Sequence, residues 1–146
     1  MKMTQCQIGK IGLIDNDIIM VDIESGIEIG IEHIYEFQNV AADLVDAQKK
    51  LYSIVSYGAY SMPTKEAREF CGREEVNNNH FLARALVVHG LGQMIIAKHT
   101  IKQRKSSVPT RIFTDTKKAK KWVKELRSKN NDYQLISKYS EKVKRI

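Results

Sequence analysis

The sequence is poor in cysteine, proline and aromatic residues, and it contains no long apolar run. Its 146 residues include two cysteines, two prolines and one tryptophan. Cys6 and Cys71 form neither a disulfide framework nor a metal-ligand spacing, so we expect a reducing, cytoplasmic compartment. No stretch approaches the ~20 apolar residues of a membrane span, and the chain start lacks the apolar core of a signal peptide. These absences predict a soluble protein.

Catalytic and metal-binding patterns are also missing. No Ser/His/Asp, Cys/His or paired-carboxylate arrangement can be assembled from the sequence spacing. The four histidines show neither an H-E-x-x-H motif nor a nearby carboxylate pair: His33, His80, His89 and His99. We therefore assign no catalytic residue, no metal and no cofactor, and we expect a protein that is not an enzyme. Residues distant in the sequence remain free to converge in the fold.

The Gly90-Leu91-Gly92 segment follows a predicted strand and precedes a predicted helix, as a dinucleotide-binding loop does. However, Ile95 occupies the position of the third glycine, and no acidic residue follows ~20 positions later at the end of a strand. A simple turn is therefore favoured over a dinucleotide site.

Positive charge is concentrated at the C-terminal end of the chain. The formal net charge is +7, but residues 1–104 contain 11 Lys and Arg against 13 Asp and Glu. Residues 105–146 contain 13 Lys and Arg against 4 Asp and Glu. A basic segment of this kind can bind nucleic acid, anionic lipid or an acidic protein, although a solvated helix face is the favoured interpretation.

The first third of the chain predicts a hairpin followed by a helix. Ile8 to Leu13 and Ile18 to Ile23 have the pattern of two strands, joined by the turn Asp15-Asn16-Asp17. This turn lacks the glycine and the distal glutamate of a calcium-binding loop, so a plain turn is favoured. After a brief extended piece over 27–29, one helical face carries Ile34, Phe37, Ala41, Leu44, Val45 and Gln48.

The middle of the chain predicts two more strands, each followed by a helix. The strands are expected at Leu51 to Tyr57 and at Ala83 to His89. A helix that begins after Thr64 and can extend over 74–76 follows the first of them. The helix at Gln93 to Gln103 is apolar over more than one face, which predicts a homodimer.

The segment from Val108 to Leu126 is a complete strand-to-helix unit. Arg111 to Phe113 form a short strand, and a helix follows whose apolar face buries Trp122 against the sheet. Three residues complete that face: Ala119, Val123 and Leu126. The pattern then predicts a break at Asn130-Asn131. Ile136, Tyr139, Val143 and Ile146 recur near helical spacing beyond it.

These elements predict an α/β fold with one mixed sheet covered by helices. The later strands, each separated by a helix, should run parallel through right-handed crossovers. Residues 1–126 form the expected domain, and residues 127–146 form a basic C-terminal tail or helix.

Three motifs carry a resemblance to a known family. They are P-T-R-I-F-T-D-x-x-x-A-x-x-W from Pro109, T-K-E-A-R-E-F from Thr64 and A-L-V-V-H-G from Ala85. The chain resembles the small bacterial SpoIIAA-like proteins of the STAS superfamily, the STAS/SEC14-like group, over residues 8–126. The resemblance implies a mixed sheet of four to five strands with helices packed mainly on one face, frequent homodimers and no established enzyme activity.

The same resemblance draws attention to the turn from Tyr60 to Lys65. In the anti-sigma factor antagonists, a serine or threonine at the corresponding turn is phosphorylated. Ser61 and Thr64 are the candidate phosphoacceptors here, and a helix N-terminus stabilises a phosphate. Because the Asp-Ser-Ser-Gly type of motif is absent, capping of the helix by Ser61 or Thr64 is favoured over a phosphoswitch.

We therefore expect a non-catalytic regulatory or protein-interaction module of the STAS-like class. It should form a homodimer, and the other protein that it binds is not identified by the sequence. Two alternatives stay open. One is a carrier that holds a lipid or other apolar small ligand between helix and sheet, as SEC14-like membership implies. The other, less favoured, is nucleic-acid binding by the basic C-terminal segment. A carrier requires an apolar cavity, which distinguishes it from the other two.

Overall fold

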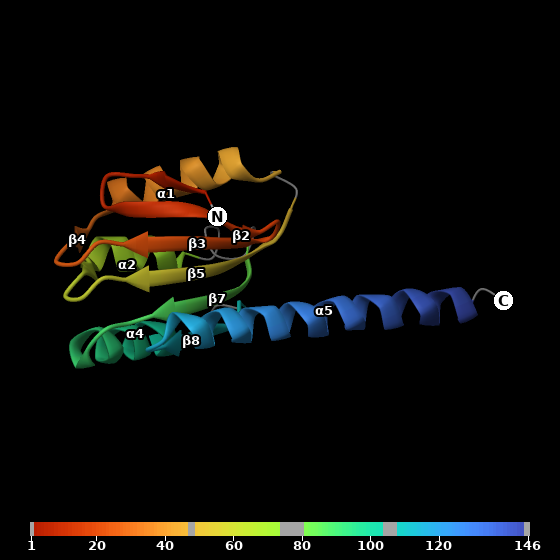
Figure 1. The fold of residues 1–146 in the computed structure, drawn as a ribbon. Coiled ribbons are helices and arrows are strands. Elements are labelled where there is room, and N and C mark those ends of the chain that lie inside the picture. Colours follow the sequence, from red (N-terminus) through yellow and green to blue (C-terminus); the bar gives the residue numbers. More distant parts are fainter. Residues whose placement is uncertain (1, 47–48, 74–80, 104–107, 145–146) are drawn as a thin grey trace.

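A six-stranded mixed sheet forms the centre of the protein (Figure 1). The computed structural model describes residues 2–46, 49–73, 81–103 and 108–144, with side chains described as far as residue 131. The sheet has the strand order β1-β2-β3-β5-β7-β8. Its strands are β1 (Met3–Gln5), β2 (Gly9–Asp15), β3 (Ile18–Ile23), β5 (Leu51–Tyr57), β7 (Phe81–Val87) and β8 (Thr110–Phe113).

The predicted hairpin and the predicted parallel strands are both confirmed. Strand β2 pairs with β3 antiparallel, and residues 16 and 17 form the turn between them. Strands β3, β5, β7 and β8 pair in parallel, with β3 and β5 in the middle of the sheet. Leu51, Tyr52 and Ile54 of β5 are all buried, as the apolar pattern of a central strand predicts.

The helices lie on both faces of the sheet. They are α1 (Ile31–Leu44), α2 (Lys65–Gly72), α4 (Leu91–Gln103) and α5 (Thr116–Lys144). The parallel strands follow one another in space in the same order as in the chain, so right-handed crossovers place their connecting helices on one common face. Helices α1, α2 and α4 share that face, while α5 follows the last strand and packs on the other. Most of the helical layer thus lies on one face, as predicted.

The predicted number of strands, four to five, is wrong because the main sheet has six. Strand β1 is a three-residue edge strand of polar sequence that pairs antiparallel with β2, and so short a segment has no readable periodicity. A separate two-stranded parallel sheet joins β4 (Glu28–Ile29) to β6 (Met62–Pro63). This small sheet connects the entry of α1 to the entry of α2.

The predicted apolar face of α5 is confirmed. Ala119 and Val123 are completely buried, and they belong to the same core cluster as Ala83 and Ala85 of β7. The small alanine side chains let the helix backbone lie close to the strand. Trp122 packs on Phe113 with ring centroids 5.7 Å apart and is partly buried against the same core cluster, in line with the predicted packing on the sheet.

The predicted break at Asn130-Asn131 is wrong, because α5 continues through both residues to Lys144. The Asn130 side chain donates a hydrogen bond to the Tyr52 hydroxyl at 2.8 Å. An asparagine usually weakens a helix by bonding to nearby backbone, and this tertiary bond engages its amide elsewhere. Figure 1 shows the C-terminal part of α5 extending past the end of the sheet.

Some sequence predictions fall on positions that the structure leaves out. Gln48, His80 and the helical extension over 74–76 lie outside the described residues, as does Ile146. Residues 136, 139 and 143 lie within the helical backbone of α5, but their side chains are also outside the described part.

Candidate functional site

A cavity of about 210 Å³ lies between the sheet and helices α1, α2 and α4. Val21, Val55 and Leu86 from three adjacent parallel strands are part of its floor. Phe37 of α1 and Ile96 of α4 are among the side chains that cover it. Since strand residues alternate between faces, this cavity is separated by the sheet from the core beneath α5.

The volume of the cavity limits the size of a bound molecule. An apolar cavity of ~150 Å³ holds one benzene molecule. By proportion, 210 Å³ accommodates about eight non-hydrogen atoms. A whole phospholipid is several times larger, so the cavity fits a small apolar molecule or one short hydrocarbon chain.

Gln93 connects the two loops at the carboxyl ends of β5 and β7. Its side-chain amide donates hydrogen bonds to the backbone oxygens of Gly58 and Ser61, both at 2.8 Å. Its side-chain oxygen accepts a hydrogen bond from the His89 backbone N–H at 2.7 Å. Gln93 is buried and lines the cavity, so these three bonds fix the shape of one cavity wall.

The two candidate phosphoacceptors have different structural roles. Thr64 is the N-cap of α2, and its hydroxyl oxygen accepts a hydrogen bond from the Ala67 backbone N–H at 3.0 Å. Ser61 is only 1 % exposed. Its hydroxyl accepts a hydrogen bond from the Ile27 backbone N–H at 3.0 Å and donates one to the backbone carbonyl oxygen of Glu24. The predicted capping by Ser61 or Thr64 is confirmed, with Thr64 as the cap. Phosphorylation at this turn stays a prediction.

Exposed apolar side chains lie next to cavity-lining residues in the chain. Tyr60 is 89 % exposed and precedes Ser61, and it has a positive φ of 66°. Leu91 is 75 % exposed, and Ile95 is more than half exposed. Large apolar side chains in solvent are unusual where they cluster, and they are typical of contact surfaces.

Two arginines are part of the cavity wall. Arg84 projects from β7, and its guanidinium carbon lies 4.7 Å from the centre of the Phe81 ring. Arg68 belongs to α2, and its Nη1 donates a hydrogen bond to the Pro63 oxygen at 2.8 Å. Both side chains are partly buried. No acidic residue is found among the described residues that line the cavity.

The two cysteines lie in separate places and form no disulfide. Cys71 is half-buried and lines the cavity. Cys6 is buried in the core near α1, where burial raises the pKa of its thiol and the charge of Glu36 adds to the effect. A raised pKa keeps the Cys6 thiol protonated and weakly nucleophilic.

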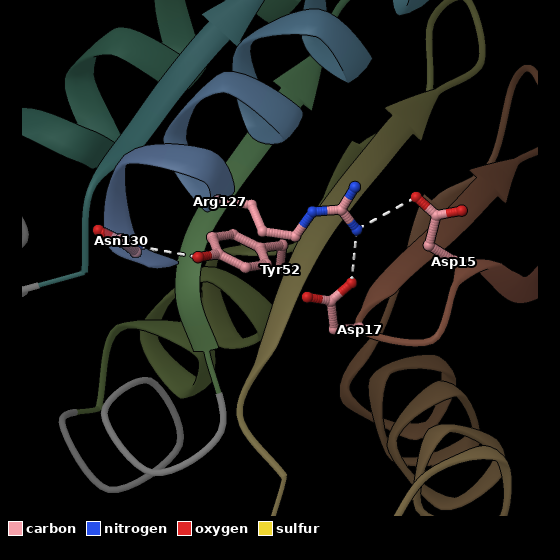
Figure 2. Close-up of polar contacts among 5 residues, drawn as sticks. All are labelled: Asp15, Asp17, Tyr52, Arg127 and Asn130. Atoms are coloured by element: carbon pink, nitrogen blue, oxygen red, sulfur yellow. Dashed lines mark hydrogen bonds and ion pairs between the residues drawn. The ribbon is translucent and has the colours of Figure 1, made fainter. Parts of the chain in front are cut away.

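The acidic turn Asp15-Asn16-Asp17 binds α5 (Figure 2). Arg127 Nη1 lies 2.8 Å from Asp17 Oδ1 and 3.1 Å from Asp15 Oδ2. The hydrogen bond to Asp17 is the largest cause that raises the pKa of Arg127. One helical turn further on, Asn130 contacts Tyr52 of β5. The carboxylates of this turn therefore hold a helix, which the comparison with calcium-binding loops did not anticipate.

The remaining sequence motifs have structural roles where the structure describes them. His33 Nδ1 accepts a hydrogen bond from the Gly30 N–H at the start of α1, and His89 Nδ1 lies 2.6 Å from the backbone carbonyl oxygen of Tyr57. Gly90 has a φ of 109°, which confirms a turn at that segment. Within the described ranges, no three His, Cys, Asp or Glu side chains are grouped for a metal, and no helix is long and apolar enough to cross a membrane.

Sequence reasoning missed the side chains that shape the cavity. Arg84 was detectable, because it is a charged residue inside an otherwise apolar strand, F-L-A-R-A-L-V. Gln93 gave no such signal, since a glutamine near the start of a helix is ordinary. Arg68 also sits in a common helical context, so only the fold shows that these residues share one cavity.

Comparison with known proteins gives one match. The model of one protein family matches residues 13–127, which includes both arginines, the cavity helices and the first part of α5. No curated protein and no solved structure matches the chain. By this match over most of its length, the chain belongs to the family described as a domain of unknown function (DUF7793).

Proposed function

We propose that the protein is a non-catalytic binding module that holds a small apolar ligand in the cavity between the sheet and helices α1, α2 and α4. The apolar cavity of about 210 Å³ carries this proposal. Concave, largely apolar spaces with a few polar groups are the usual form of small-molecule sites. Of the functions considered from the sequence, the carrier is the one that needs such a cavity, and its size favours a small ligand over an intact lipid.

The polar groups of the cavity support binding without catalysis. The amide of Gln93 is occupied by bonds to three backbone groups, and the hydroxyl of Ser61 is occupied by bonds to two. Side chains engaged in this way position loops. They are not held ready to attack a ligand or to transfer a proton.

Binding of 1-octanol, followed by isothermal titration calorimetry and amide NMR shifts, tests the proposal. We expect saturable binding, with shifts concentrated at the cavity. Ala97 lines the cavity from α4, and Ala97→Phe should weaken binding at least about ten-fold, since each methylene kept in water costs ~0.8 kcal/mol.

His99→Phe is the matched control for this variant. His99 is exposed on the same helix and does not line the cavity, so the new phenyl ring lies outside the cavity and octanol affinity should not change. Thermal unfolding of both variants shows whether they fold. Equal octanol affinity in Ala97→Phe and the parent protein, or no saturable binding at all, contradicts the proposal.

The second candidate is a protein-interaction module that acts as a homodimer. The exposed apolar side chains of Tyr60, Leu91 and Ile95 favour it, because a symmetric contact would remove them from water. We expect light scattering to give the dimer mass, and Leu91→Lys with Ile95→Lys to give the monomer mass. A monomer mass for the parent protein at high micromolar concentration would exclude this candidate.

We also infer a relationship to the STAS superfamily and a cytoplasmic location. The mixed sheet with α1, α2 and α4 on one face supports the first inference. The lack of a disulfide between Cys6 and Cys71 supports the second, because disulfides are rare in a reducing compartment. Nucleic-acid binding by the lysines of α5 is the third candidate, and it predicts an affinity that falls steeply with salt.

A further inference from the structure

We propose that the cavity selects small apolar ligands that carry one hydroxyl or carbonyl group, and that the Ser53 hydroxyl binds this group. The inference rests on the function proposed above and narrows its ligand class to alcohols, phenols and ketones of about eight non-hydrogen atoms. Ser53 belongs to β5, one of the two middle strands of the sheet, and it is part of the cavity floor.

The alternation of strand residues places the Ser53 side chain on the cavity face of the sheet. Tyr52 and Ile54 belong to the core cluster beneath α5, whereas Ser53 and Val55 line the cavity. Ser53 is only 6 % exposed, so it is almost completely enclosed by the protein. Because a serine oxygen is bonded directly to Cβ, this hydroxyl stays at the floor of the cavity.

The Ser53 hydroxyl makes no hydrogen bond to any residue that the structure describes, which distinguishes it from other hydroxyl groups of the lining. Three of those already donate to backbone carbonyl oxygens: Ser61 to Glu24, Thr100 to Ile96 and Thr110 to Val108. Buried polar groups without a partner are rare in folded proteins, because each one costs free energy. A ligand that supplies the missing hydrogen bond removes this cost.

The chemistry of the cavity floor defines the ligand. A serine hydroxyl donates one hydrogen bond and accepts up to two, so it can bind either a hydroxyl group or a carbonyl oxygen. Val21, Val55 and Leu86 of the same floor are apolar and suit the hydrocarbon part of the molecule. A pure hydrocarbon could fill the same space, but it would leave the Ser53 hydroxyl unpaired.

Phenol and toluene form the decisive pair of probes, because they have the same shape and differ only by a hydroxyl in place of a methyl group. Ser53→Ala should reduce phenol affinity about five-fold to ten-fold, the effect of one hydrogen bond, and leave toluene affinity unchanged. The ratio of the two affinities therefore separates the hydrogen bond from the apolar contacts. Isothermal titration calorimetry of the full chain measures both affinities.

Ser56→Ala is the matched control. Ser56 lies on the same strand and is also 6 % exposed, but it is outside the cavity lining and faces α5 by the alternation of the strand. This variant should leave both affinities unchanged. Ser53→Ala should also keep the melting temperature of the parent protein, and a clear drop would show that the Ser53 hydroxyl already has a structural partner, contrary to the inference.

The outcomes separate this inference from the function on which it rests. If Ser53→Ala lowers phenol and toluene affinity equally, or changes neither, the role of Ser53 is wrong and the apolar binding function stays intact. Saturable binding of neither probe contradicts the proposed function itself. If Ser53→Ala fails to fold, Ser53→Cys gives the same test, because a thiol is only a weak hydrogen-bond donor and acceptor.

Discussion

Replacing Tyr52 with alanine should lower the free energy of unfolding by about 4 kcal/mol, among the largest effects of any single substitution in the sheet. Tyr52 is among the largest fully buried side chains, and it lies between β3 and β7 on the α5 face. Truncation would leave a cavity beneath the helix, because the backbone of a central strand cannot collapse into it. Urea unfolding followed by circular dichroism measures the change.

The Tyr52→Phe variant distinguishes the contribution of the Tyr52 ring to stability from the contribution of its hydroxyl group. This variant removes only the acceptor for Asn130, so we expect a loss of about 1 kcal/mol. A loss in Tyr52→Phe as large as that in Tyr52→Ala would show that the hydroxyl contact dominates the ring packing, contrary to this account. A negligible loss in both variants would show that α5 does not pack on β5.

Gln93→Ala should cost about 3 kcal/mol of unfolding free energy and loosen one wall of the cavity. The substitution removes the partners of three backbone groups, in Gly58, Ser61 and His89, and each buried group left unsatisfied costs ~1 kcal/mol or more. Amide hydrogen exchange should rise in the loops after β5 and β7. Unchanged exchange there would contradict the role of Gln93 as their link.

Gln93→Glu adds a pH dependence with a defined sign. The new carboxylate would face the Gly58 and Ser61 oxygens, so its folded-state pKa should rise above the ~4.3 of an unfolded glutamate. A raised folded-state pKa contributes stability below the unfolded pKa, and this stability is lost as pH rises through the folded pKa. The free energy of unfolding of Gln93→Glu should therefore be closest to that of the parent protein near about pH 4, and it should fall below the parent value as the pH rises to neutral.

The fold was readable from sequence where one local pattern determined the structure. The apolar run of β5 and the spacing of Ala119 and Val123 in α5 agree with their surroundings, so pattern and packing give the same answer. The pattern failed at Asn130, where a distant tyrosine supplies the hydrogen bond that local chemistry would otherwise seek. It also failed at β1, whose pairing depends on the free edge of β2.

The candidate site was less accessible to sequence reasoning than the fold. A cavity exists where side chains from several elements fail to fill a space, and no spacing along the chain encodes that shortfall. Arg68 belongs to α2 and Arg84 to β7, and only the fold brings both residues to the lining of one cavity. The sequence linked the carrier alternative to an apolar cavity, but the residues that line the cavity were not predictable from it.

Strand β5 has one set of residues on each face of the sheet. Tyr52 and Ile54 point to the core beneath α5, while Ser53 and Val55 point to the cavity. Neighbouring residues of β5 therefore pack in different environments, one in the core beneath α5 and the next in the cavity lining. If the cavity binds a ligand as proposed, substitutions at the cavity-facing positions would change the ligand preference, while the α5-facing positions would preserve the packing of the core.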